Sequence, residues 1–298
     1  MYLKSRYTRV NGSSLMYADA QKACIHVLVF LLTVLPLCFS AYGQSPNSES
    51  LGTLSELRRM AGKGNTEADR KLAVECRNLA KKHFEDGDYP TALSLFHEAA
   101  ALGDAGSQGV LGSMYHQGVP AAGITQNYAE AARWYRKSAE QGHSFAQHYL
   151  GKLYNNGDGV PQSFAEAAKW FELAAQNGHV ASQVQIGLKL QFGEGVEQNF
   201  STAANWFRRA ADQGNADAQH NLSFLYLQGQ GVPQDYVEAH KWINIASSLA
   251  KGTDHNKFVE TRNLLSKMMT AQQIAEAQRL AHEWKPVTPE SNGQRTPK

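Results

Sequence analysis

The chain has 298 residues, and its 29 lysines and arginines nearly balance its 27 aspartates and glutamates, for a formal net charge of +2. Residues 1–43 hold four of the basic residues and one of the acidic ones, which leaves 25 basic against 26 acidic residues in the rest of the chain. A chain so close to neutrality has no bulk electrostatic attraction to nucleic acid or to anionic lipid, and we expect neither as a partner.

The N-terminus has the pattern of a secretory signal peptide. An apolar run, residues 24–39, is followed by the small residues Ala41 and Gly43 at the two positions that a signal peptidase reads, which places cleavage before Gln44. The run is shorter than the roughly 20 residues that a membrane-spanning helix needs. We therefore expect residues 1–43 to be removed and the protein to be periplasmic or secreted. The alternative is an uncleaved anchor that holds the protein to the membrane.

Two segments precede the most regular part of the chain. Residues 44–65 are polar and rich in serine and glycine, so we expect a flexible linker with a short helix around Leu54–Met60. Residues 66–87 carry apolar side chains at helical spacing and predict a helix that caps the following array. Cys76 in this segment is the one cysteine outside the signal peptide, so no disulfide within the mature chain is possible. We interpret it as a core residue.

Near-copies of one segment follow one another in the middle of the chain. They begin at Tyr128, Phe164 and Phe200, with a shorter fourth copy at Tyr236 and a degenerate one at Tyr89. The same tryptophan recurs in four of the copies: Trp134, Trp170, Trp206 and Trp242. A constant period of 36 residues is typical of a solenoid, which presents an extended surface rather than one catalytic pocket.

Each copy predicts two helices. In the copy that begins at Tyr128, apolar residues recur on one helix face, and Gly142 is expected to end the first helix in the left-handed conformation. The second helix should run over about 144–155, with Tyr154 on its buried face. Glycine inside such a helix costs about 1 kcal/mol relative to alanine. Its recurrence at one repeat position predicts a close approach of two helices there, at Gly112, Gly151 and Gly187, with Ser223 in the last copy.

The recurring pattern is aromatic-x-[EA]-A-x-W-[FY]-x-x-A-A-x-x-G, then A-Q-x-x-L-G-x-x-Y-x-x-G-x-G-V-P-Q. It resembles the Sel-one-like repeat (SLR) family, relatives of the tetratricopeptide repeat. The resemblance covers about residues 88–285. It implies an all-α fold, a right-handed αα-solenoid of about four to five helix-turn-helix repeats with capping helices, the last at 269–284. The copy at Tyr89 departs from the pattern, with Leu95 in place of tryptophan. Residues 286–298 are expected to be a disordered tail.

No arrangement of residues in the sequence points to catalysis or to a metal. There is no H-E-x-x-H, no C-x-x-C and no phosphate-binding glycine loop, and the histidines recur in repeat register. The loops with Asp158 and Glu194 offer too few oxygen ligands for calcium. Ser248 and Lys251 form one Ser-x-x-Lys, a β-lactamase spacing, but the partner motifs S-D-N and K-T-G are absent. We expect no enzyme, no catalytic residue, no cofactor and no metal.

The resemblance implies that the first helix of each pair lines a concave groove that binds a partner. The outward positions of these helices are mostly basic, so we expect a protein or peptide that docks through an acidic or phosphate-like segment. These positions are Arg133, Arg136, Lys137, Lys169, Glu172, Asn205, Arg208, Arg209 and Lys241. The alternative is a set of solvated helix faces whose cations pair locally with Glu130, Glu140 and Asp212.

These observations predict a non-catalytic scaffold, adaptor or regulator of the bacterial envelope or secreted space. The alternative is an envelope protein that binds or acts on peptidoglycan or another glycan, because a cysteine-rich branch of the SLR family was linked to penicillin binding. That branch pairs cysteines within each repeat, and the repeats here have none. The four tryptophans could stack on sugars, but their place at the edge of the apolar face favours a packing role.

Overall fold

The computed structural model describes residues 50–62 and 66–287. The expected signal peptide, its cleavage site and the possible anchor at residues 24–39 lie outside the described residues, as do residues 288–298. Within the described ranges every regular element is a helix, apart from an isolated bridge between Val119 and Ile124. None of these helices has the length and the apolar character needed to cross a membrane.

The chain forms two compact units, and the first contains the described residues up to Gly103 together with 119–124. Its elements are α2 (Ser50–Met60), α3 (Thr66–Glu85), α4 (Tyr89–Ala101) and the 3-10 turn η2 (Pro120–Ala122). Helix α2 lies in the segment that we expected to be a linker, and it includes the short helix suggested there. Helix α3 occupies the segment expected to cap the array and packs along α4.

Cys76 is fully buried in the first unit, as the sequence predicted. Burial, with the neighbouring Glu98 carboxylate, raises the pKa of its thiol to about 12, so the thiol stays protonated at neutral pH. Arg58 of α2 binds the same carboxylate with two hydrogen bonds, from Nε to Oε1 at 2.7 Å and from Nη2 to Oε2 at 2.6 Å. This pair ties α2 to α4.

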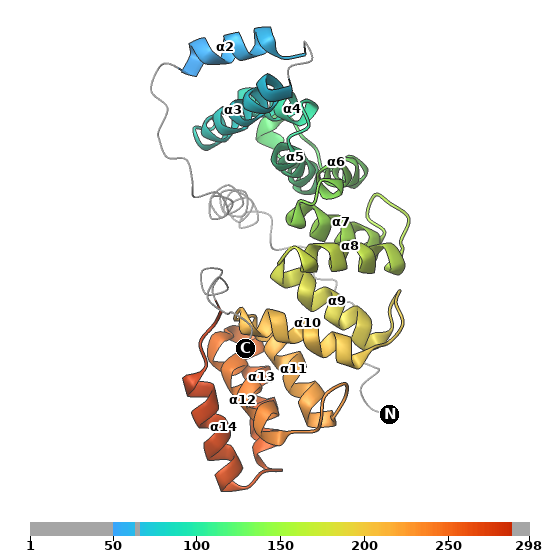
Figure 1. The fold of residues 1–298 in the computed structure, drawn as a ribbon, viewed down its shortest axis with the longest axis vertical. Helices are drawn as coiled ribbons and strands as arrows, with labels where there is room; N and C mark the ends of the chain where they lie inside the picture. The colour runs from blue at the N-terminus through green and yellow to red at the C-terminus, as the bar shows by residue number, and fades with distance from the viewer. Residues whose placement is uncertain (1–49, 63–65, 288–298) are drawn as a thin grey trace. The chain divides into compact units, whose positions relative to one another are not determined.

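The second unit contains residues 104–118 and the described residues from 125 onward. Its helices are α5 (Ala105–Gln117), α6 (Tyr128–Glu140), α7 (Ser144–Asn156), α8 (Phe164–Gln176), α9 (Val180–Phe192), α10 (Phe200–Asp212), α11 (Ala216–Gln228), α12 (Tyr236–Leu249), α13 (Gly252–Ser266) and α14 (Ala271–Glu283). From α5 to α13 each helix packs against the next (Figure 1), which is the arrangement of an αα-solenoid. The all-α solenoid predicted from the repeats is confirmed.

Local sequence defines where these helices begin and end. The residue before each first helix is an N-cap whose side chain accepts a hydrogen bond from a backbone N–H of the first turn. These caps are Asn127, Ser163, Asn199 and Asp235. The turn to each second helix needs a left-handed residue, and Gly142, with φ of 85°, shows why glycine recurs there.

The recurring glycines of the second helices meet aromatic rings, as predicted. A Cβ atom on Gly112 would lie 2.5 Å from the Tyr135 ring. The corresponding distances are 2.9 Å from Gly151 to Phe171 and 2.6 Å from Gly187 to Phe207. In each case a second helix receives the ring of the following first helix. In the last copy Ile243 replaces the ring, and Ser223 replaces glycine and donates a hydrogen bond to the Ala239 carbonyl at 2.7 Å.

Two recurring glutamines explain further parts of the repeat pattern. The glutamine of A-Q reaches back to a carbonyl in the last turn of the preceding first helix: Gln147 to Ala139 at 3.0 Å, Gln183 to Ala175 at 3.3 Å and Gln219 to Ala211 at 3.1 Å. The glutamine that ends each exit loop donates to a carbonyl near the end of the second helix: Gln162 to Asn155, Gln198 to Gln191 and Gln234 to Leu227. Both bonds satisfy carbonyls that a helix end leaves without a partner.

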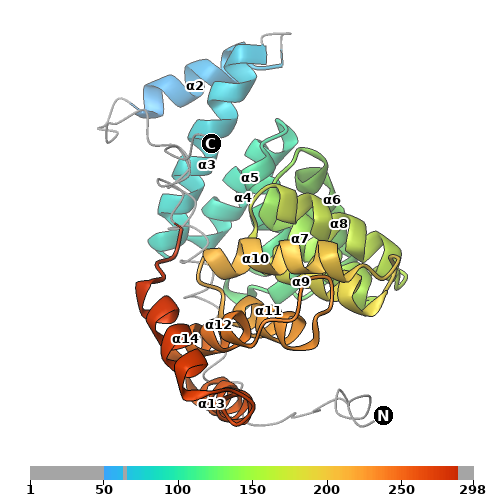
Figure 2. The ribbon, with the colours of Figure 1, turned by 60° about the horizontal axis from the view of Figure 1, so that its bottom comes forward.

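The C-terminal end of the chain folds back on the second unit. Helix α14 packs against α12 (Figure 2), and only Ala277 of α14 is buried. The backbone N–H of Val287 donates a hydrogen bond to the carbonyl of Asp212 at 2.7 Å, where α10 ends. The sequence predicted disorder from residue 286 onward, whereas the structure places Pro286 and Val287 against α10.

Candidate functional site

The nine positions proposed for partner binding lie on the four first helices α6, α8, α10 and α12. Arg208 and Lys241 are half-buried, and the other seven are exposed. Arg133 binds Glu130 at 2.8 Å, which is one of the local ion pairs of the alternative interpretation. Lys241 also pairs locally, with Glu238 at 3.1 Å, a partner that the sequence did not suggest. Local pairing therefore accounts for a small part of this surface, which we call the first-helix face.

Each first helix holds a cation above the ring of its recurring tryptophan. The distances from the cation to the ring centre are 4.3 Å for Lys137 on Trp134, 5.9 Å for Lys169 on Trp170, 4.7 Å for Arg209 on Trp206 and 4.7 Å for Lys241 on Trp242. Such contacts contribute about 0.5–1 kcal/mol at exposed sites and restrict the cation to one place. The sequence identified both residue types but did not connect them.

Arg136 and Arg208 make a different contact, with a tyrosine of the second helix. Arg136 donates a hydrogen bond to the hydroxyl of Tyr154, and Arg208 donates one to the hydroxyl of Tyr226. Their guanidinium carbons lie 5.9 Å and 5.4 Å from the ring centres. We expected Tyr154 on the buried face of its helix, but it is half-buried and serves as the acceptor for Arg136.

The copy between these two pairs lacks the arrangement. It has Glu172 where the others have arginine and Leu190 where the others have tyrosine. The first-helix face therefore carries positive, negative and positive charge at one position of three successive copies.

The recurring tryptophans become more buried along the array. Trp134 and Trp170 are half-buried, whereas Trp206 is 8% exposed and Trp242 is 1% exposed. Trp170 packs on the core of the preceding copy, and Trp242 packs on the core formed by α10 and α11. Burial of this degree supports the packing role that the sequence favoured for Trp206 and Trp242.

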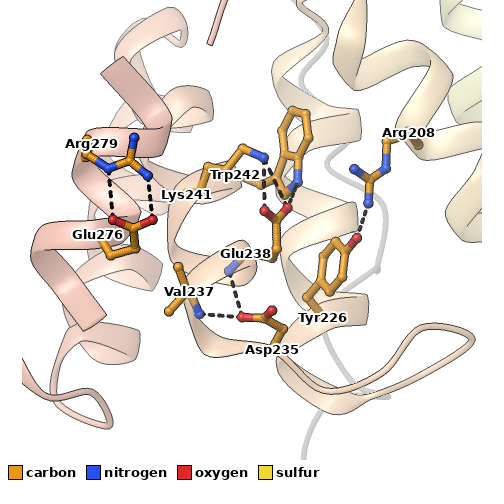
Figure 3. Close-up of polar contacts among 9 residues, drawn as sticks. All are labelled: Arg208, Tyr226, Asp235, Val237, Glu238, Lys241, Trp242, Glu276 and Arg279. Atoms are coloured by element: carbon orange, nitrogen blue, oxygen red, sulfur yellow. Dashed lines mark hydrogen bonds and ion pairs between the residues drawn. The ribbon is translucent and has the colours of Figure 1, made fainter. Parts of the chain in front are cut away.

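The indole of Trp242 is hydrogen-bonded within its own helix. Its Nε1 donates to Oε2 of Glu238 at 3.0 Å, and the same carboxylate accepts from Lys241 (Figure 3). Arg208 lies 5.5 Å from the ring centre of Trp242. Trp284, just after α14, meets Trp242 edge-on with ring centres 6.3 Å apart. The equivalent nitrogen of Trp170 is buried and has no hydrogen-bond partner among the described residues.

Buried histidines form the second group of titratable residues that the repeats bring together. The rings of His148 and His179 lie 4.4 Å apart, and Ser182 Oγ lies 2.8 Å and 3.0 Å from their Nδ1 atoms. Burial lowers the pKa of His148 to about 3 and that of His179 to about 4, so both are neutral at pH 7. In the part of the chain that the structure describes, no three His, Cys, Asp or Glu residues are grouped as a metal site requires.

The Ser-x-x-Lys spacing lies at the end of α12. Ser248 Oγ donates a hydrogen bond to the Ile245 carbonyl at 2.7 Å. Lys251 follows the end of that helix at Leu249 and precedes α13. The two residues therefore do not share a helix turn, which the catalytic arrangement would need.

Comparison with known families matches the repeats to the model described as "Sel1 repeat". The matched segments are residues 76–104, 106–143, 144–179, 180–215 and 216–250, which together make up more than half of the chain. From residue 106 onward each matched segment joins a second helix to the first helix that follows it. In the segments from residue 106 to residue 215, this is the pair in which the recurring glycine meets a ring.

Individual relatives match less of the chain. The rat protein "DAP3-binding cell death enhancer 1" is 34% identical over 116 residues, which are 38% of this chain and 21% of that protein. The chain thus spans about a fifth of the length of this curated relative.

Two solved structures align with this chain. A Sel1 repeat protein from Oxalobacter formigenes aligns with a TM-score of 0.59 at 24% identity, over 71% of this chain and 86% of that one. The protein c5321, a protective antigen of uropathogenic Escherichia coli strains with an SLR fold, aligns with a TM-score of 0.48 at 26% identity, over 93% and 64%. The first likeness agrees with the αα-solenoid.

Proposed function

The chain belongs to the Sel1 repeat family, and on that premise we propose that it is a non-catalytic adaptor or regulator that binds a partner protein on its first-helix face. Sel1 repeat proteins are generally non-catalytic scaffolds for protein interactions. The rat relative is named for its binding of another protein.

The observation that carries this proposal is the row of cations held on aromatic rings. Arginine and aromatic side chains dominate the binding energy of most protein interfaces. A lysine or arginine that already rests on a ring loses less side-chain entropy when a partner arrives. The four cation–tryptophan contacts recur on successive first helices and therefore form one extended surface rather than isolated points.

The chemistry of this face favours an acidic partner. Seven of the nine positions are basic, and among the described residues only Arg133 and Lys241 of these seven have a carboxylate at salt-bridge distance. Exposed charges of one sign accelerate the association of an oppositely charged partner, and salt screens the effect.

The test is charge reversal at exposed positions. Lys137, Lys169 and Arg209 are each changed to Glu, and affinity is measured for a partner captured with the wild-type chain from native extract. We expect a loss of roughly tenfold at low salt and a smaller loss at high salt. Full affinity at low salt in the reversed protein would exclude this face.

The matched control reverses three exposed lysines that lie off the first helices of the array: Lys152, Lys257 and Lys267. It changes the net charge by the same amount. An equal loss of affinity in both proteins would mean that the total charge, and not the first-helix face, determines binding.

We also propose that the protein works in the periplasm or outside the cell, since the apolar run at residues 24–39 ends in a small-residue cleavage pattern. N-terminal sequencing of the exported protein should begin at Gln44. A sequence that begins at Met1 or Met16 would support the membrane anchor instead.

A glycan ligand is the second candidate, and the half-buried Trp134 and Trp170 are the residues that favour it. Lys137 rests on one face of Trp134 at 4.3 Å, which leaves less of that ring for stacking on a sugar. Glycan binding that is lost when Trp170 is substituted, with the helical signal intact, would favour this candidate over a protein partner.

A further inference from the structure

The last copy of the array is covered by the end of its own chain. We call Trp284–Val287 the C-terminal arm. Trp284 of the arm meets Trp242 of α12, with ring centres 6.3 Å apart at an interplanar angle of 72°. Two residues later, Pro286 lies 3.8 Å from the position that a Cβ atom on Gly214 would take. The N–H of Val287 then donates to the Asp212 carbonyl at 2.7 Å.

Three residues of the arm thus contact three recurring positions of the repeat. An aromatic side chain meets the recurring tryptophan, a proline covers the turn glycine, and a backbone N–H binds the carbonyl at the end of a first helix. That carbonyl belongs to the last helical turn, whose carbonyls have no partner within the helix. We call the residues involved, with the arginine and tyrosine beside them, the occupied site: Arg208, Asp212, Gly214, Tyr226 and Trp242.

Four of these five residues recur 72 residues earlier in the chain, and the fifth, Asp212, is replaced there by glutamate. We call this set the upstream site: Arg136, Glu140, Gly142, Tyr154 and Trp170. In both sites the arginine donates to the tyrosine hydroxyl and lies over its ring, at 5.9 Å upstream and 5.4 Å in the occupied site. The turn glycines have nearly equal φ values of 85° and 86°. The two sites therefore share the arginine–tyrosine contact and the conformation of the turn glycine.

The upstream site differs from the occupied site in what covers it. Apart from the adjacent residues of the chain, no atom of the described residues lies within 4 Å of the position that a Cβ atom on Gly142 would take, while the Gly142 carbonyl accepts a hydrogen bond from Asn177 Nδ2 at 3.2 Å. Trp170 is half-buried, whereas Trp242 is 1% exposed beneath the arm. The Trp170 Nε1 atom has no hydrogen-bond partner among the described residues, although it is buried.

The copy between the two sites serves as an internal comparison. Its turn glycine, Gly178, is also uncovered, but Glu172 and Leu190 replace the arginine and the tyrosine. Gly142 and Gly178 are thus the two uncovered turn glycines among α6–α10. Only the copy with Gly142 also has the arginine and the tyrosine of the occupied site.

We propose that the upstream site binds an extended segment of a partner protein in which an aromatic residue is followed two positions later by proline. The aromatic side chain packs edge-on against Trp170, the proline covers Gly142, and the N–H of the next residue binds the Glu140 carbonyl. The arm of the same chain is held on its own site by contacts within one molecule, so the occupant comes from another protein. This inference rests on the proposed function and specifies the partner segment.

The test uses the full chain and a synthetic peptide with the sequence of residues 280–289, which carries the tryptophan and the proline of the arm. Binding is measured by calorimetry, and the bound position is read from chemical-shift changes at Gly142 and at the Trp170 indole. We expect saturable binding with a dissociation constant below about 1 mM. Peptides with alanine in place of the tryptophan or the proline should bind at least roughly fivefold more weakly.

Two variants and two controls locate the peptide. Trp170→Leu should weaken binding at least roughly tenfold, and Arg136→Gln, at an exposed position that leaves folding intact, at least roughly threefold. The matched controls are Trp134→Leu, the same repeat position outside the site, and Glu172→Gln, the counterpart of Arg136 in the middle copy. Both controls should bind within about twofold of wild type.

Three results would overturn the inference. They are the absence of saturable peptide binding up to about 1 mM, binding that neither Trp170→Leu nor Arg136→Gln weakens, and a concentration-dependent dimer that Trp284→Ala abolishes. The third would assign the site to the arm of a second copy. A partner protein could lose its affinity on charge reversal of the first-helix face and keep it for Arg136→Gln and Trp170→Leu. That result would contradict this inference and leave the proposed function in place.

Discussion

At the scale of single residues, the middle copy carries a buried cation where its neighbours carry leucine. Lys189 occupies the position of Leu153 and Leu225 and is 4% exposed. Its Nζ atom binds Oε2 of Glu194 at 2.9 Å and lies 4.5 Å from the centre of the Phe164 ring. A buried charge is tolerated when it is paired and hydrogen-bonded, and the ring adds a second favourable contact.

We predict that removing the partner of Lys189 costs more stability than removing Lys189 itself. Glu194→Gln leaves a buried ammonium without its counter-ion, and we expect a loss of about 1–2 kcal/mol, reduced from the larger cost of a fully buried pair because Glu194 is half-exposed. Lys189→Leu restores the residue of the other copies and should be neutral or stabilising. Urea unfolding of both variants measures the difference.

A lower unfolding free energy for Lys189→Leu than for Glu194→Gln would contradict this account. It would mean that the ion pair stabilises the fold by more than the desolvation of its two charges costs.

At the scale of elements, the fold depends on how a second helix receives a ring from the next first helix. The three glycine–ring contacts leave no room for a side chain, because a Cβ atom on the glycine would lie within 2.9 Å of ring atoms in each of them. Glycine lowers helix propensity, so its place inside three helices has a tertiary cause. The closeness of these helix pairs also explains why the repeat pattern keeps glycine at this position of the second helix.

We predict that Gly151→Leu destabilises the protein and that Lys152→Leu does not. The leucine at 151 would overlap the Phe171 ring, and overpacking of this kind costs about 1–3 kcal/mol. Lys152 is exposed on the next position of the same helix, and its substitution should change stability by about 0.5 kcal/mol or less. Denaturant midpoints give both values, and equal midpoints for the two variants would contradict the contact.

At the scale of the whole molecule, several buried histidines link stability to pH. Burial lowers the pKa of His148 to about 3 and those of His179 and His220 to about 4, and it also lowers the pKa values of His116 and His240. In the unfolded chain these groups have pKa values near about 6.5. Below that pH the unfolded state binds more protons than the folded state, so stability falls as the pH falls.

We predict that the unfolding free energy decreases between pH 7 and pH 4.5. A single histidine whose folded pKa is about 4 should contribute about 2–3 kcal/mol of this decrease. His220 stacks on Phe258 with ring centres 4.8 Å apart, so His220→Phe keeps an aromatic contact and removes the titration. Urea unfolding at the two pH values should show a smaller decrease in unfolding free energy for that variant than for the wild type. An equal decrease would mean that His220 is already protonated in the folded state at pH 4.5.

At the candidate site, the sequence predicted which positions face outward but not which residues contact one another across helices. Helical periodicity identified the basic positions of the first helices, because outward positions follow from the 3.6-residue turn. It did not identify Tyr154 as the acceptor of Arg136, which lies 18 residues away on another helix. It also did not detect the arm on Trp242, since Trp284 and Trp242 meet only after α13 and α14 have folded back.

The sequence by itself determined the repeat, its helix ends, the glycine contacts and the family, because capping, turn conformation and periodic burial are properties of short segments that recur. Only the tertiary structure decided which of four tryptophans at one repeat position is covered. Trp134 and Trp170 are half-buried and Trp242 is 1% exposed, although their place in the repeat is the same. The difference comes from neighbouring helices and from the C-terminal arm. Burial depends on what packs over a side chain, and local sequence does not encode that.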